Sequence, residues 1–182
     1  MADVVEQFSA RSHARIHALR LLYQRELTGV AIDDIIAHPD SFTPENEYRD
    51  LCEHTFGSTG CAATCEEFDR CEYRAFFAQY PSEPNAYTCE IARGVVEQER
   101  EIDALLDATS DSWPVSRMPI VDRNIARIAI WELLRRHPEV PASVAINEAV
   151  QIAKEYGGED SAMFINGVLG EIDKRINEGE AQ

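Results

Sequence analysis

The chain has 182 residues and carries 33 acidic against 17 basic side chains, so its formal net charge at pH 7 is −16. This length is enough to bury a hydrophobic core in one domain or two small subdomains. The sequence has no run of about 18 apolar residues, and no basic segment followed by an apolar stretch at its start, so we expect a cytoplasmic protein without a membrane span. The acidic bulk argues against non-specific nucleic-acid binding, because phosphate contacts dominate that affinity.

The charge is unevenly distributed along the chain. Residues 41–112 hold 16 acidic and 5 basic side chains, whereas residues 11–25 hold four arginines, two histidines and no acid. Such a short basic segment permits a directed contact with a polyanion even on an acidic protein. The alternative is a solvated helix face with scattered arginines.

Five cysteines are present. Four of them cluster, namely Cys52, Cys61, Cys65 and Cys71, and the fifth is Cys89. An odd count without a secretion signal argues against a disulfide framework. A structural zinc site usually has two closely spaced pairs, whereas only Cys61 and Cys65 form such a pair here. The pattern therefore favours reduced thiols packed in a helix, and no metal ion is predicted; a zinc site and a redox role stay open as alternatives.

Helical periodicity and turn residues divide the first part of the chain. A helix is predicted over residues 11–28 and ends at Gly29, and a short one over 32–37 ends before Pro39. Further helices are predicted after Thr43-Pro44 and over residues 61–80, and residues 80–85 form a loop. A single long helix is predicted over residues 86–108.

Residues 120–135 form a helix whose apolar side chains run almost all the way round it. A helix that is apolar on every side lies in the middle of a bundle. Arg127 and Glu132 interrupt this apolar surface and need partners, because an unpaired buried charge is costly. We expect each of them to form a structural ion pair.

Two more helices, joined by a glycine break, are predicted over residues 141–172. Pro141 lies at the start of the first, where Ser143 can cap it. Gly157-Gly158 ends that helix, because glycine readily adopts the left-handed conformation. Asp160 or Ser161 caps the second helix. Its inner stripe is Ile165, Val168, Leu169, Ile172 and Ile176, and Phe164 lies at the edge of this stripe.

No enzyme is predicted. The sequence has no glycine-rich phosphate loop, no zinc-protease helix and no nucleophile elbow. The periodicities predict an all-α fold with about seven helices and no strands.

Three runs closely resemble the NusB family of bacterial transcription antitermination factors: RMPIVDRNIARIAIWELL, VAINEAVQIAK and GGEDSAMFINGVL. The resemblance implies two packed helical bundles in a domain at residues 11–176, with an acidic insertion at about 42–85. It implies a protein that binds boxA-type RNA of ribosomal RNA leader transcripts together with a small-subunit ribosomal protein, known in this role as NusE. The pair helps the transcription elongation complex to read through terminators, with no reaction and no cofactor.

The same resemblance places Arg11, Arg15, Asp160 and Phe164 at RNA-contacting positions. An aromatic ring at a helix edge can stack on an unpaired base. From the residues alone, a core position is favoured for Phe164 and a helix cap for Asp160. Tyr23 and Asp122 match positions near the family's contact with the ribosomal protein.

Two functions from other classes stay open. One is an interaction scaffold with weak or lost RNA binding, which the net charge favours. The other is a domain like the NusB-like helical domain found at the N-terminus of ribosomal RNA cytosine methyltransferases.

Overall fold

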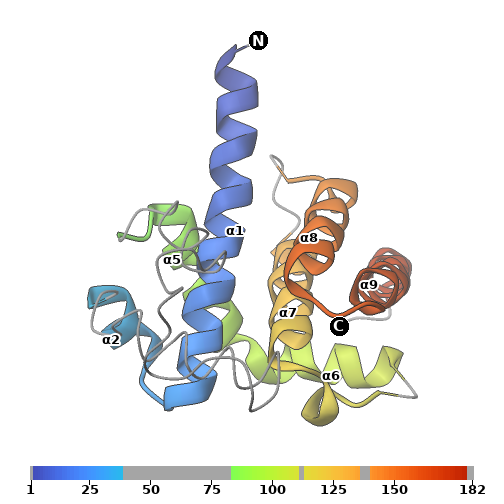
Figure 1. Cartoon of the computed structure of the whole chain (residues 1–182). Helices are drawn as coiled ribbons and strands as arrows, with labels where there is room; N and C mark the ends of the chain where they lie inside the picture. The colour runs from blue at the N-terminus through green and yellow to red at the C-terminus, as the bar shows by residue number, and fades with distance from the viewer. Residues whose placement is uncertain (1, 39–82, 111–112, 136–139, 180–182) are drawn as a thin grey trace.

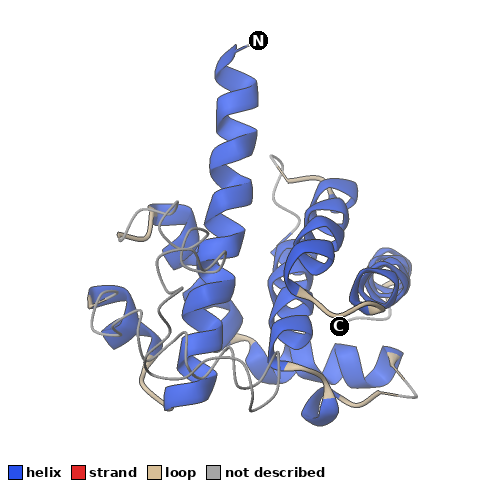
Figure 2. Cartoon of the chain, viewed as in Figure 1, coloured by secondary structure: helices blue, strands red, loops and turns tan. Residues whose placement is uncertain are grey.

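The computed structural model describes residues 2–38, 83–110, 113–135 and 140–179. In these ranges it contains seven α-helices, one 3₁₀ turn and no strand (Figure 2), which confirms the predicted all-α class. The helices predicted near residues 43–57 and 61–80 lie outside the described ranges, as do four of the five cysteines. The domain boundaries at 11–176 and the insertion at about 42–85 stay predictions.

The elements follow one another in the order shown in Figure 1. They are α1 (Ala2–Thr28), α2 (Ile32–Ala37), α5 (Ala86–Glu97), α6 (Glu99–Thr109), the 3₁₀ turn η3 (Val115–Arg117), α7 (Ile120–Arg135), α8 (Ala142–Tyr156) and α9 (Ser161–Glu178). The bounds of α2 and α7 agree with the prediction, whereas α1 begins nine residues earlier, at Ala2 rather than at residue 11.

Helix α7 lies at the centre of the described bundle. It packs against α1 and α5 on one side, α8 and α9 on the other, and α6 at its N-terminal end (Figure 1). Every residue from Asn124 to Leu133 is buried. The prediction that this helix lies in the middle of a bundle is therefore confirmed, because its apolar side chains meet a neighbouring helix in each direction.

The two charged residues within the buried stretch of α7, Arg127 and Glu132, are ion-paired, as predicted. Arg127 donates from Nε and Nη2 to the two carboxylate oxygens of Asp103, at 2.7 Å each, and from Nη1 to Glu26 at 2.6 Å. Glu132 accepts a hydrogen bond from Nε of Arg15, on α1, at 3.0 Å. Burial opposes the charge of Arg127, but these carboxylates outweigh it and raise its pKa. Ion pairs thus connect α7 to α1 and α6.

The prediction of one continuous helix over residues 86–108 is wrong, because the helix is interrupted in its middle. At Gln98 the backbone leaves the helical region (φ −106°, ψ 13°), and α5 ends where α6 begins. The break lets α5 pack along α1 while α6 turns to pack against α7 and α9. Apolar spacing continues on both sides of Gln98, so periodicity alone does not reveal the change of direction.

Helix ends differ in detail from the prediction. Gly29 is left-handed (φ 70°) and ends α1 as expected, but Gly157 is extended (φ −88°, ψ 177°). A Cβ on Gly157 would lie 2.6 Å from the carbonyl oxygen of Ala153 and would also collide with Ser161, so a close approach requires this glycine. Ser143 is not a cap, because α8 already begins at Ala142 after Pro141.

Candidate nucleic-acid interface

Arg11 lies on α1 beside an aromatic ring of α5. Its guanidinium carbon is 5.6 Å from the centre of the Tyr87 ring, within the range of a cation–π interaction. Both side chains are half-buried. This contact places the guanidinium of Arg11 between α1 and α5, and Arg11 as a whole stays partly exposed.

Arg15, one turn further along α1, is buried and only 2% exposed. Its Nε donates to both carboxylate oxygens of Glu132 at 3.0 Å, and Nη1 reaches Glu148 at 3.3 Å. The hydroxyl of Tyr87 also donates to Glu132. Burial opposes the charge of Arg15, but the carboxylates outweigh it and raise its pKa. The exposed phosphate contact expected of Arg15 is thus not what the structure shows: Arg15 ties α1 to α7 and α8.

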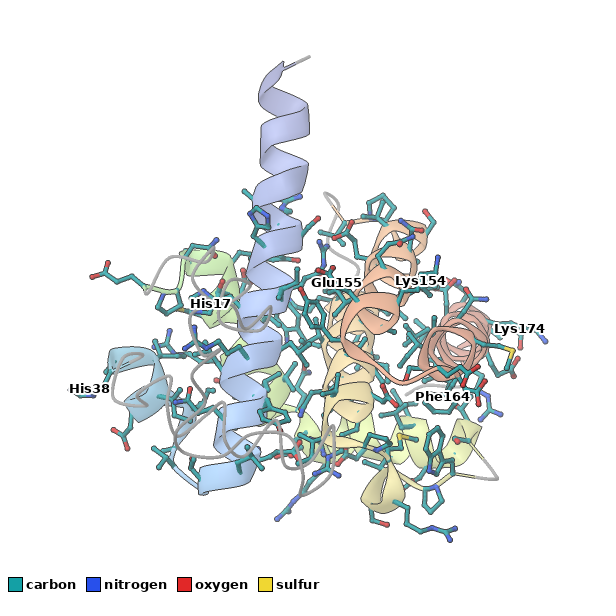
Figure 3. All side chains as sticks on the ribbon, viewed as in Figure 1. His17, His38, Lys154, Glu155, Phe164 and Lys174 are labelled. Atoms are coloured by element: carbon teal, nitrogen blue, oxygen red, sulfur yellow. The ribbon has the colours of Figure 1, made fainter. Side chains whose placement is uncertain are left out.

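The basic segment of residues 11–25 presents fewer charges than its composition suggests. His17 is buried, Arg15 is paired as described, and Arg25 donates to both carboxylate oxygens of Glu99, at 3.0 and 3.3 Å. Figure 3 shows His17 on α1. Part of the segment is turned inward because α1 packs against α2, α5 and α7, so side chains that point in different directions from the helix meet a neighbour.

The buried His17 predicts a stability that falls in mild acid. Burial, followed by the charge of Arg20, lowers the pKa of His17 to about 4. Below about pH 6.5 the unfolded chain binds a proton that the folded chain does not. The free energy of unfolding should therefore decrease by up to about 3 kcal/mol between pH 6.5 and pH 4, with the loss complete below pH 4.

Urea denaturation at several pH values measures this effect. Because carboxylates titrate in the same range, the relevant quantity is the difference between the natural protein and His17→Gln, whose stability should depend less steeply on pH. Equal slopes for the two proteins would show that His17 is solvated rather than buried.

Asp160 and Phe164 lie together at the start of α9. Asp160 is exposed at the N-cap position, and its side chain makes no capping hydrogen bond. The amide of Phe164 donates to the carbonyl of Asp160 at 3.0 Å. The half-buried Phe164 ring meets Trp113 edge to face, with ring centroids 5.0 Å apart and an interplanar angle of 67°. Phe164 is thus a partly exposed ring at the margin of the core rather than a fully buried one.

The two residues predicted near a protein partner differ in exposure. Tyr23 is half-buried on α1, whereas Asp122 is 2% exposed in the first turn of α7. Asp122 forms a side-chain hydrogen bond with Ser161, but burial dominates and raises its pKa. Its Oδ1 has no hydrogen-bond partner within the described part of the chain. Asp122 therefore lies beneath the start of α9 and offers little surface to a partner.

The predicted RNA contacts fall into two groups. Arg11 belongs to the α1–α5 side of α7, whereas Asp160 and Phe164 belong to α9 on its other side (Figures 1 and 3). The sequence predicts neither Tyr87 nor Trp113 as a contact residue. The only sequence signal for Trp113 is an aromatic residue before a proline, between two predicted helices, and Tyr87 carries none.

The described residues lack two kinds of feature. No group of three or more His, Cys, Asp or Glu side chains in them is arranged to hold a metal ion. None of the helices in these ranges combines the length and the apolar character needed to cross a membrane.

Comparison with known sequences gives consistent matches. The model of the NusB family matches residues 61–174. A transcription antitermination protein NusB from Anaeromyxobacter dehalogenans is 34% identical over 166 residues, which is 90% of this chain and 90% of that protein. The chain belongs to the NusB family. Another NusB, from Desulforapulum autotrophicum, is 48% identical over 95 residues, which is 51% of this chain and 66% of that protein, just under two thirds.

Solved NusB structures have the same fold. A structure of NusB from T. maritima is similar with a TM-score of 0.57 and 25% identity, covering 90% of each chain. A crystal structure of the antitermination factors NusB and NusE in complex with double-stranded RNA is similar with a TM-score of 0.57. Its identity is 20%, and the match covers 91% of this chain and 97% of that one, so this likeness shows the NusB fold alone.

Proposed function

We propose that this protein is a transcription antitermination factor that binds boxA-type RNA of ribosomal RNA leader transcripts together with a small-subunit ribosomal protein acting as NusE. The observation that carries this proposal is the 34% identity to an antitermination protein over nine tenths of both chains. A structural neighbour is itself a complex of NusB with NusE and RNA. The protein then binds and positions RNA without a chemical reaction or a cofactor.

The charge of the molecule explains the need for a partner. A net charge of −16 repels phosphate, and the inward turn of Arg15 and His17 leaves a small basic surface on α1. A basic ribosomal protein adds contacts on the same RNA and so raises the overall affinity. RNA binding by this chain alone should be weak and sensitive to salt.

The residues of the RNA contact have distinct roles. Arg11 is the proposed phosphate contact, Phe164 the base-stacking ring, and Asp160 an exposed acceptor beside it. Arg15 is reassigned as a positioning residue that fixes α1 against Glu132 and Glu148. Tyr23 is retained as the proposed surface contact with the ribosomal protein, and Asp122 lies behind the RNA-binding end of α9.

The test is RNA binding measured by fluorescence anisotropy, with and without the ribosomal protein, for a boxA-type RNA and a scrambled RNA of equal length. We expect a preference for the boxA-type sequence that strengthens when the ribosomal protein is present. Equal binding of the two RNAs, or none by either, would contradict the proposal.

In the joint complex, Phe164→Ala should weaken RNA binding by about 1–3 kcal/mol, the usual range for losing one stacked base. The salt dependence should stay almost unchanged, because stacking releases no counterions. Arg11→Ala should instead reduce the slope of log affinity against log salt by about one, because it removes a phosphate contact. A Phe164→Ala protein that melts at a much lower temperature but binds RNA normally would assign the ring to packing only.

A second candidate is an interaction scaffold that has lost RNA binding. It is favoured by the burial of Arg15 and by the pairing of Arg25 with Glu99. Such a protein would bind the ribosomal protein in a pull-down assay while the boxA-type RNA gives no anisotropy change at low salt.

A further inference from the structure

Trp113 lies between α6 and α7, in the segment between the helices predicted over residues 86–108 and 120–135. Hydrogen bonds hold its backbone in place. Ser110 Oγ donates to the carbonyl of Trp113 at 3.0 Å, and the amide of Trp113 donates to the carbonyl of Ser110 at 3.3 Å. The amide of Val115 donates to Asp107 at 2.8 Å. The backbone of Trp113 is thus held by hydrogen bonds to Ser110, and the next turn by the contact of Val115 with Asp107.

The rings of Trp113 and Phe164 are inclined to each other by 67°, and neither side chain is fully buried. Edge-to-face packing covers at most one face of one of the two rings. The pair therefore has more aromatic surface than its own contact uses. The neighbouring Met163, at 74% exposure, is among the two most exposed large apolar side chains of the described residues.

The elements that carry Trp113 and Phe164 also carry arginines, which favours a nucleic acid strand over a protein helix as the ligand. Arg117 is exposed on η3, four residues after Trp113. Arg175, half-buried on α9, donates to the carbonyl of Ala108 at 3.1 Å, which joins α9 to the end of α6. An exposed arginine four residues from a partly exposed aromatic ring provides the combination of phosphate contact and stacking surface that single strands use.

We propose that Trp113 is a second base-stacking residue, so that Trp113 and Phe164 receive two neighbouring unpaired bases of the RNA. This inference rests on the proposed RNA-binding function and extends it to a residue outside the predicted set. Because the ring planes are inclined by 67°, the two bases have to be splayed apart. Bases stacked in a duplex are parallel and cannot meet both rings, so the pair selects a flexible single strand.

Intrinsic fluorescence can test this on the natural protein. The chain has two tryptophans, and the other one, Trp131, is buried in α7. Addition of a single-stranded boxA-type RNA at low salt should quench the emission, and a duplex of the same sequence should quench it less. Trp113→Phe should lose this quenching while it keeps most of the affinity, because it retains an aromatic face.

Affinity then separates stacking from packing. Trp113→Leu, which keeps apolar volume without an aromatic face, should bind the single strand about 5–150-fold more weakly, the range expected for one lost stacked base. Its slope of log affinity against log salt should match that of the natural protein. Thermal melting of Trp113→Leu is the folding control, and quenching of the natural protein needs no variant at all.

Two other results have clear meanings. If Phe164→Ala weakens binding while RNA leaves the emission unchanged and Trp113→Leu binds normally, Trp113 only packs against Phe164 and the proposed function stands. If the natural protein binds no RNA, with or without the ribosomal protein, the proposed function fails and the role of Trp113 fails with it.

Discussion

Replacing Glu132 by glutamine should lower the free energy of unfolding by about 3–5 kcal/mol, the usual cost of breaking a buried ion pair by removing one partner. The exposed fractions of the Arg15 and Glu132 side chains are 3% and 2%, so neither can exchange its partner for water. Glutamine keeps the shape of the side chain but leaves the guanidinium of Arg15 with Glu148 as its one remaining carboxylate partner among the described residues. The hydroxyl of Tyr87 also loses a charged acceptor. Chemical denaturation at neutral pH measures the change.

Glu148→Gln is the matched control for this prediction. It removes a carboxylate from the same arginine, but the Glu148 side chain is 23% exposed and its contact is longer, at 3.3 Å. A partly exposed pair contributes about 1 kcal/mol or less, so the control should be close to the natural protein. Similar losses in both variants would mean that water reaches Arg15 and that the pair is not a buried one.

Replacing Gly94 by alanine should destabilise the protein by about 1–3 kcal/mol, the usual cost of inserting a methyl group into a filled core. A Cβ at Gly94 would lie 2.7 Å from Cζ2 of Trp131, and closer still to its Nε1 and Cε2. The indole is 2% exposed and is covered by the guanidinium of Arg135, 4.9 Å from the ring centre, so it has little room to move. The sign of the change in the free energy of unfolding is informative, because replacing glycine by alanine within a helix otherwise stabilises a protein by about 0.5–1 kcal/mol.

Gly167→Ala provides the opposite case in the same protein. Gly167 is also inside a helix, α9, but a Cβ there meets nothing within 4 Å. Its replacement should raise the melting temperature while Gly94→Ala lowers it. If Gly94→Ala were neutral or stabilising, α5 and α7 would not approach each other as closely as the structure shows.

The sequence predicts helices well where one face is apolar, and it predicts tertiary partners poorly. The bounds of α7 follow from its apolar residues, and the need of Arg127 and Glu132 for partners follows from their position inside it. The partners themselves lie far away in the chain: Arg15 and Glu132 are separated by 117 positions. Neither periodicity nor spacing carries information over such a distance.

The same limit applies to the candidate site. Residues 11–25 are basic in composition. The direction in which Arg15 and His17 point, however, depends on where α5, α7 and α8 pack. The kink at Gln98 is decided by the same packing. The proposed role of Trp113 depends on its contact with Phe164 on α9. The sequence does not show where α9 lies relative to the segment between α6 and α7.

The central position of α7 has a consequence for the length of any strand that this protein can hold. Arg11 and Phe164 belong to helices that lie on different sides of α7, and a helix with its side chains is about 10 Å across. Because α7 is enclosed by its neighbours, the two proposed RNA contacts stay at a fixed separation and cannot approach each other. A single nucleotide or a very short oligomer can therefore occupy only one of them, and simultaneous contact with both sets a minimum length for the bound segment.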